Sequence, residues 1–95
     1  MYFYYIAGPM TGYPGLNRPA AIALAIKLQK QGHAVFIPHI MPEIPGFKLN
    51  DYLTLDYYII SKCDRVIMMT NWSESEGAMK EYQYARLLGK VIVYE

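Results

Sequence analysis

A chain of 95 residues, 54% of them apolar and 18% charged, predicts one folded domain over residues 1–95 and excludes a disordered chain. Its net charge of +1 lacks the basic excess of nucleic-acid-binding proteins, so we expect no nucleic-acid partner. The single cysteine, Cys63, excludes an internal disulfide framework and a thiolate zinc site. No apolar run is long enough to cross a bilayer, and the first residues resemble a strand rather than a signal peptide. We therefore expect a cytoplasmic protein without a membrane partner.

Strands and helices are expected to alternate along the chain. Runs of aromatic, β-branched and other apolar residues predict strands at 2–7, 33–37, 65–70 and 90–94. Helices are expected between Asn17 and Gly32, over 51–62 and over 74–88. Asn17 and Asn50 are predicted N-caps of the first two helices, and Ser73 with Glu76 has the spacing of a capping box for the third.

The order β-α-β-α-β-α-β predicts the fold class: a small α/β, Rossmann-like (flavodoxin-like) three-layer sandwich with a four-stranded parallel sheet. Ligands of such sheets bind beyond the carboxyl ends of the strands. The segments expected at that edge are the loops 8–16, 38–49 and 71–76, where glycine and polar residues are concentrated.

The loop after the first strand is rich in glycine. Gly8, Gly12 and Gly15 permit positive φ angles and a close approach of backbone to ligand. The helix N-terminus near Asn17 offers free N–H groups to an anion, and Arg18 adds a positive charge. The loop matches neither the dinucleotide-binding nor the Walker A pattern. An anion site and an ordinary tight turn are both compatible with it.

Two acidic residues are candidates for chemistry. Glu81 shares a helix face with Gly77, Tyr84 and Leu88, so it is either a functional carboxylate or a solvated helix residue. Asp56 lies at the expected edge of the core. If the two carboxyls meet, their pKa values would split into those of a nucleophile and a proton donor.

The remaining side chains have weaker signals. Trp72 and Tyr13 are placed either to stack on a base or to pack against the protein. His33 and His39 have no acidic or cysteine partners at ligand spacing, so we expect no metal and no other cofactor.

Three segments together resemble the nucleoside 2-deoxyribosyltransferase superfamily. They resemble most its short branch, which is often borne by phages or prophages and is related to the 2'-deoxynucleoside 5'-monophosphate N-glycosidases. The segments are Tyr5 to Gly12, Asp56-x-x-x-Ile60-x-x-Cys63-Asp64, and Ser75-x-Gly77-x-x-x-Glu81 with the Leu88-Gly89-Lys90-Val91 that follows. Each motif is weak alone, whereas their joint order and spacing are fairly specific.

This resemblance implies roles for individual residues. Glu81 matches the nucleophile that forms a covalent glycosyl-enzyme, Asp56 matches the residue that helps the base to leave, and Tyr5 matches the tyrosine that orients the nucleophile. Ser75 matches a position at which serine accompanies a 5'-phosphate and aspartate a free 5'-hydroxyl. The implied substrate-binding residues are Gly8, Pro9, Met10, Thr11, Gly12, Arg18, Trp72, Ser75 and Gly77. Pro9 and Thr11 replace a serine and an arginine that contact phosphate in the hydrolases.

The resemblance therefore implies a hydrolase, or a transferase, that acts on the N-glycosidic bond of a nucleoside 5'-monophosphate. Two alternatives are a module of the same fold that binds a nucleotide without cleaving it, and a small interaction protein whose tyrosines form an interface. Under each hypothesis we expect a homo-oligomer, most simply a dimer, because the core is small and the third helix is expected to expose Met79, Tyr82 and Tyr84.

Overall fold

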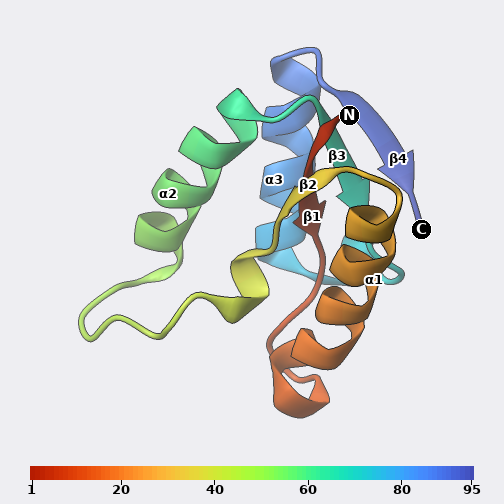
Figure 1. Ribbon diagram of the computed structural model, residues 1–95. Helices are drawn as coiled ribbons and strands as arrows, with labels where there is room; N and C mark the ends of the chain where they lie inside the picture. The colour runs from red at the N-terminus through yellow and green to blue at the C-terminus, as the bar shows by residue number, and fades with distance from the viewer.

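The computed structural model describes all 95 residues and contains a four-stranded parallel sheet with three helices (Figure 1). The strands are β1 (Phe3–Ala7), β2 (Ala34–Phe36), β3 (Arg65–Met68) and β4 (Val91–Tyr94). The helices are α1 (Arg18–Lys30), α2 (Leu49–Lys62) and α3 (Glu76–Leu87). Short 3-10 turns lie at η1 (Pro14–Asn17), η2 (Pro38–Ile40) and η3 (Trp72–Glu74).

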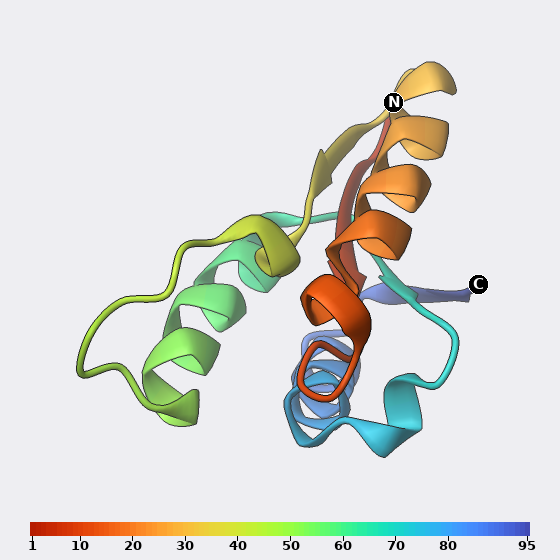
Figure 2. The same ribbon diagram turned by 90° about the horizontal axis from the view of Figure 1, so that it is seen from below.

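The sheet has the strand order β2-β1-β3-β4, and all of its pairings are parallel. Successive side chains of β1 point to opposite faces. Ile6 packs with Leu24 of α1 on one face, whereas Tyr5 packs with Ile60 of α2 and Ala85 of α3 on the other. Figure 2 shows these layers from below, with α1 on one side of the sheet and α3 on the other. The predicted three-layer α/β sandwich is confirmed.

The strand order reverses at the centre of the sheet. The chain passes from β1 to β2 on one side and then crosses to β3 on the other, so the loops after β1 and β3 diverge at the carboxyl edge. Such a reversal leaves a crevice in open parallel sheets. This is the edge at which the sequence placed the candidate residues.

Two of the three helix starts differ from the predicted caps. Helix α2 begins at Leu49, because the backbone N–H of Lys48 donates to Asp51 Oδ2 at 2.8 Å, and Asn50 lies inside the first turn. The cap of α3 is Ser75 rather than Ser73, since Ser75 Oγ accepts from the N–H of Ala78 at 3.2 Å. Asn17 occupies the N-cap position of α1, as predicted, but its side chain makes no cap bond and instead donates to the carbonyl of Pro9.

No helix of the structure combines the length and the apolar composition that a membrane crossing requires. The three side chains expected to be exposed on α3, Met79, Tyr82 and Tyr84, are each half-buried. Tyr84 stacks on Tyr57 of α2 with ring centroids 4.3 Å apart. Much of the aromatic surface of α3 is therefore used within the chain, which weakens the argument for an oligomer from these tyrosines.

Candidate active site

A cleft of about 750 Å³ opens at the carboxyl edge of the sheet, between the loop after β1, the start of α3 and the inner side of α2. This size is ordinary for a pocket that takes a small molecule. It lies at the reversal of strand order, as the parallel topology predicts. Figure 2 shows α2 and the loop that precedes it standing apart from α1 and α3 around this region.

The cleft has two walls of different chemistry. The residues of the first come from the strand-one loop and the start of α3; we call it the glycine wall, and it consists of Gly8, Met10, Thr11, Ser75 and Gly77. The residues of the second come from the loop before α2 and from α2 itself; we call it the aromatic wall, and it consists of Ile44, Phe47, Leu49, Tyr52 and Leu53. The walls approach each other where Gly77 faces the side chain of Leu49.

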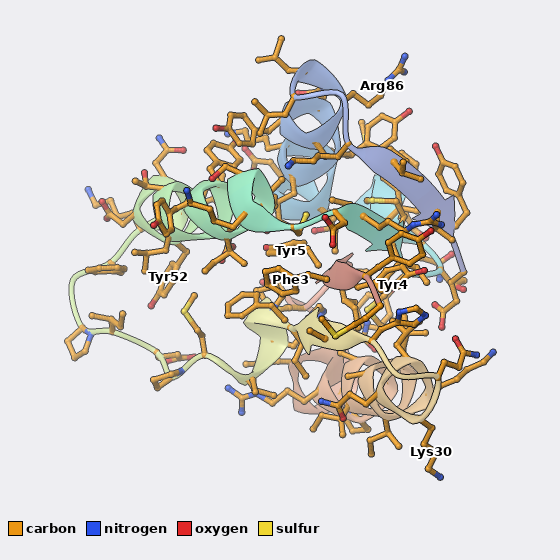
Figure 3. The ribbon with its side chains drawn as sticks, turned by 45° about the horizontal axis from the view of Figure 1, so that its top comes forward. Phe3, Tyr4, Tyr5, Lys30, Tyr52 and Arg86 are labelled. Atoms are coloured by element: carbon orange, nitrogen blue, oxygen red, sulfur yellow. The ribbon has the colours of Figure 1, made fainter.

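Two carboxylates lie in the cleft between these walls. Asp56 of α2 and Glu81 of α3 both line it, although each side chain is only 5% exposed. Tyr5, which is fully buried near the centre of the molecule in Figure 3, donates its hydroxyl to Glu81 Oε2. Asp56 Oδ1 has no hydrogen-bond partner within the chain. The structure therefore brings together the three residues that the sequence identified as catalytic.

The environment shifts the pKa values of all three groups. Burial raises the pKa of Glu81 well above its usual range, and the nearby charge of Asp56 raises it further. Burial also raises the pKa of Asp56. The pKa of Tyr5 is raised by burial and by the two carboxylates, so its hydroxyl stays a hydrogen-bond donor. The two carboxyls thus retain protons at a pH at which free carboxyls are ionised, and they titrate as a pair.

The coupling between the two carboxyls matters for the chemistry. The pKa values of Glu81 and Asp56 are both raised, and each carboxyl affects the other, so one of them can be ionised while the other keeps a proton. The hydrogen bond from Tyr5 stabilises the charged form of Glu81. This bond is compatible with the nucleophilic role that the resemblance implies for Glu81.

The glycines of the glycine wall have two effects: they allow close packing of the backbone, and they keep the cleft open. A Cβ atom on Gly8 would lie 2.5 Å from Met69 Sδ and 2.7 Å from its Cβ, so the ends of β1 and β3 can approach only because residue 8 is glycine. A Cβ on Gly77 would meet Leu49 Cδ1 at 3.6 Å, an ordinary contact that would narrow the cleft. Glycine at position 77 therefore keeps the cleft open.

Four of the expected substrate-binding residues do not line the cleft: Pro9, Gly12, Arg18 and Trp72. Pro9 is buried, and Gly12 takes a positive φ in the exposed turn beyond the cleft. Arg18 Nε donates to the carbonyl of His39 at 2.7 Å and so braces the two loops. Trp72 packs on Tyr82 with ring centroids 4.5 Å apart. Tyr13, the other candidate for stacking, also lies outside the lining.

Sequence reasoning missed the aromatic wall and two polar residues near it. Glu43, in the loop before α2, places a third carboxylate on the cleft lining. His39 is 1% exposed and neither ring nitrogen has a partner. Burial lowers the pKa of His39, and the nearby backbone of Pro9 and Gly8 opposes that shift. A signal existed for the wall, since Leu49, Tyr52 and Leu53 repeat at helical spacing before Asp56. No signal distinguished Phe47 or Glu43 within their loop.

No three histidine, cysteine or acidic side chains converge so as to hold a metal ion. The charged residues that line the cleft are Glu43, Asp56 and Glu81, and no lysine or arginine is among them. The arrangement suits a reaction that needs an anionic nucleophile, a proton donor and an apolar surface for the leaving group.

The fold is that of the nucleoside 2-deoxyribosyltransferases. It matches a 2-deoxyribosyltransferase from Leishmania mexicana with a TM-score of 0.75 and 22% identity, over 97% of this chain and 62% of that one. A 2-deoxyribosyltransferase from Bacillus psychrosaccharolyticus matches with a TM-score of 0.73 and 21% identity, over 97% of this chain and 70% of that one. The resemblance stated from the sequence is thus confirmed at the level of the fold.

The chain itself belongs to the family described as a domain of unknown function, DUF4406, whose model matches residues 2–94. No curated protein sequence matches the chain. The chain spans 62% of the length of the Leishmania enzyme that it matches.

Proposed function

We propose that this protein cleaves the N-glycosidic bond of a nucleoside 5'-monophosphate through a covalent intermediate on Glu81. The observation that carries the proposal is the buried trio of Tyr5, Asp56 and Glu81, in a cleft at the substrate edge of the sheet. Two desolvated carboxyls without a cation beside them are costly to a fold, which is expected where they serve chemistry. The fold shared with 2-deoxyribosyltransferases supports the same reaction class.

The reaction divides into two displacements at the anomeric carbon. Ionised Glu81 attacks C1' of the sugar, the C1'–N bond breaks, and its electron pair goes to the base, which takes a proton from Asp56. Water then attacks C1' of the glycosyl ester, Glu81 leaves as a carboxylate, and Asp56 accepts the proton of the water. An alcohol or a second base in place of water would give transfer instead of hydrolysis. The sequence resemblance favours water.

The start of α3 supports a phosphate in the glycine wall. Ser75 supplies a hydroxyl, and the N–H groups of Glu76 and Gly77 have no partner within the chain. A helix N-terminus of this kind attracts anions. Thr11 adds a second hydroxyl from the strand-one loop. These donors replace the basic contact that Arg18 was expected to make.

The acidity of the cleft favours a second candidate, a nucleoside without the 5'-phosphate. The three charged side chains of the lining are all carboxylates, and a dianion close to them would be repelled. The same trio would act on either substrate. The two candidates differ only in what occupies the end of the cleft near Ser75.

The test is chromatographic release of free base from ribo- and deoxyribonucleosides and from their 5'-monophosphates. Glu81→Gln should reduce release at least about a thousandfold, because the amide is not a nucleophile. The variant should remain folded. Since burial raises the pKa of Glu81, wild type loses stability as the pH rises above the usual carboxyl pKa of about 4.3, and the glutamine variant avoids that loss.

Two outcomes would contradict the proposal. Full turnover by folded Glu81→Gln would exclude the covalent intermediate. Absence of base release from any member of the panel, combined with a nucleotide-dependent rise in Tm of both proteins, would show a module that binds without cleaving.

A further inference from the structure

The aromatic wall contains the two aromatic rings of the cleft lining, Phe47 and Tyr52. Their ring centroids are 5.2 Å apart and their planes meet at 66°, which is an edge-to-face contact. In such a contact each ring keeps at least one face uncovered by the other. Phe47 is 38% exposed, a large fraction for an apolar ring. An open aromatic face in a cleft is a surface on which another planar group can stack.

The loop that carries Phe47 is fixed to α2. The hydroxyl of Tyr52 accepts a hydrogen bond from the N–H of Ile44 at 2.9 Å and lies 3.4 Å from the carbonyl of the same residue. Gly46 has φ +88°, a left-handed turn that directs the chain back toward α2 at Phe47. The N–H of Phe47 in turn donates to the carbonyl of Ile44 at 3.0 Å. Phe47 is therefore held in place before any ligand arrives, which lowers the entropic cost of binding.

The position of the wall relative to the carboxylates identifies its ligand. Leu49, Leu53 and Asp56 lie on one side of α2, because residues four and seven apart share a helix face. Asp56 marks the point at which the leaving base receives its proton in the proposed reaction. Tyr52 lies four residues before it, about one helical turn toward the mouth of the cleft. A base that contacts Asp56 thus extends along the apolar side of α2 toward the two rings.

We propose that the aromatic wall is the base-binding half of the cleft and that the nucleobase stacks on Phe47. The location of the sugar rests on the proposed function, whereas the stacking rests on the geometry of Phe47 and Tyr52. The wall offers apolar and aromatic surface over the plane of the base, so it accepts purines and pyrimidines alike. Every nucleobase has a face that stacks, and stacking discriminates little between bases.

The experiment compares ligands with and without a base in the Glu81→Gln background, where turnover does not interfere. Calorimetry would measure the Kd of a 2'-deoxynucleoside 5'-monophosphate, of the free base and of 2-deoxyribose 5-phosphate. Phe47→Ala should weaken binding of the nucleotide and of the base about tenfold or more, as expected for a lost stacking partner. Binding of the sugar phosphate should stay within about twofold of the unsubstituted background. Phe47→Trp should restore the nucleotide affinity.

A matched control distinguishes a specific loss of nucleotide affinity from a general loss of folding. Leu55 is an apolar residue of α2 with an exposed fraction of 42%, close to that of Phe47, and it lies outside the cleft lining. Leu55→Ala should leave all three dissociation constants unchanged. Thermal unfolding of each variant would confirm that the proteins compared are folded.

The inference and the proposed function fail in different ways. If Glu81→Gln retains turnover in the release assay but nucleotide affinity still depends on Phe47, the base site stands and the covalent mechanism falls. The inference is overturned if Phe47→Ala weakens nucleotide and sugar phosphate equally, if it weakens neither, or if the background protein binds no ligand of the three.

Discussion

The two walls of the cleft are supported in different ways. The backbone of the glycine wall follows β1, whose residues pair with β3, and continues at the start of α3, where Ser75 caps the helix. Two residues of the aromatic wall, Ile44 and Phe47, lie in an exposed loop that Tyr52 ties to α2, whereas the other three lie on α2 itself. Groups on regular elements are held more precisely than groups on loops. The position of Phe47 therefore depends on contacts made by a loop, whereas Ser75 and Gly77 are positioned by the start of a helix.

This contrast matches the demands of the proposed reaction. The anomeric carbon must be aligned with Glu81 within a few tenths of an ångström, so the sugar and its 5' substituent need rigid partners. The base only has to leave, and an apolar surface with one proton donor is sufficient for that. The contrast can be tested by changing one wall at a time and by asking which half of the substrate responds.

Among changes to the walls, the largest effect is expected for Ser75→Asp in the glycine wall. Aspartate is as good an N-cap as serine, so α3 should keep its start. Its carboxylate would face the 5'-phosphate, and juxtaposed like charges cost several kcal/mol, so kcat/KM for the monophosphate should fall about a hundredfold or more. Activity on the unphosphorylated nucleoside should fall much less. Initial rates on the two substrates measure the ratio.

Ser75→Asn is the matched control, because asparagine also caps helices and carries no charge. It should keep most of the activity on the monophosphate. If aspartate and asparagine at this position cost the same, the phosphate does not bind near Ser75, and the nucleoside becomes the better candidate substrate.

The difference between the walls also explains what the sequence could predict. The alternation of apolar runs with glycine and asparagine was enough for the strands, the helices and the parallel sheet. The resemblance to the deoxyribosyltransferases identified Tyr5, Asp56 and Glu81, whereas the residues alone left open whether the two carboxyls meet. Helix caps were misplaced by two residues at α2 and α3, because Asp51 accepts from the N–H of Lys48 at α2 and Ser75 accepts from the N–H of Ala78 at α3.

Residues on loops were predicted less well. Trp72 has the chemistry of a base-stacking residue, but the 3-10 turn η3 directs it onto Tyr82 instead. Phe47 has the same chemistry in a less conspicuous context, and the turn at Gly46 directs it to the cleft. Which ring reaches the ligand depends on the conformation of its loop. Loops lack the regular spacing of apolar residues from which helices and strands are predicted.

An intermediate effect is expected for Tyr5→Phe, in the buried core next to Glu81. Phenylalanine keeps the stacking of residue 5 on Phe36 but removes the donor to Glu81. That bond lowers the pKa of Glu81, so its loss should raise the pKa further. Because the nucleophile acts when ionised, the rising limb of the pH profile of kcat/KM should move to higher pH. At pH values below that limb, kcat/KM of the variant should be about tenfold lower than that of wild type for each pH unit by which the limb moves.

The shape of the pH profile of kcat/KM shows whether Tyr5 acts on the charge of Glu81 or only packs against the site. If Tyr5 acts through the charge of Glu81, the variant and wild type should converge at high pH. A loss of rate that is the same at every pH would show that Tyr5 only orients or packs the site. A shift of the limb to lower pH would contradict the assigned hydrogen bond.

The smallest effect is expected for Glu43→Gln, in the loop that carries the aromatic wall. Glu43 is exposed and forms no ion pair, so its charge acts on the ligand only through solvent. Removing one negative charge from the acidic lining should lower the KM for the monophosphate about twofold to threefold at low salt, and the KM for the nucleoside should not change. The difference should vanish at about 1 M salt, where screening is nearly complete. An equal change for both substrates would mean that Glu43 contacts the base or the sugar directly, and the aromatic wall would then contain a polar determinant of base choice.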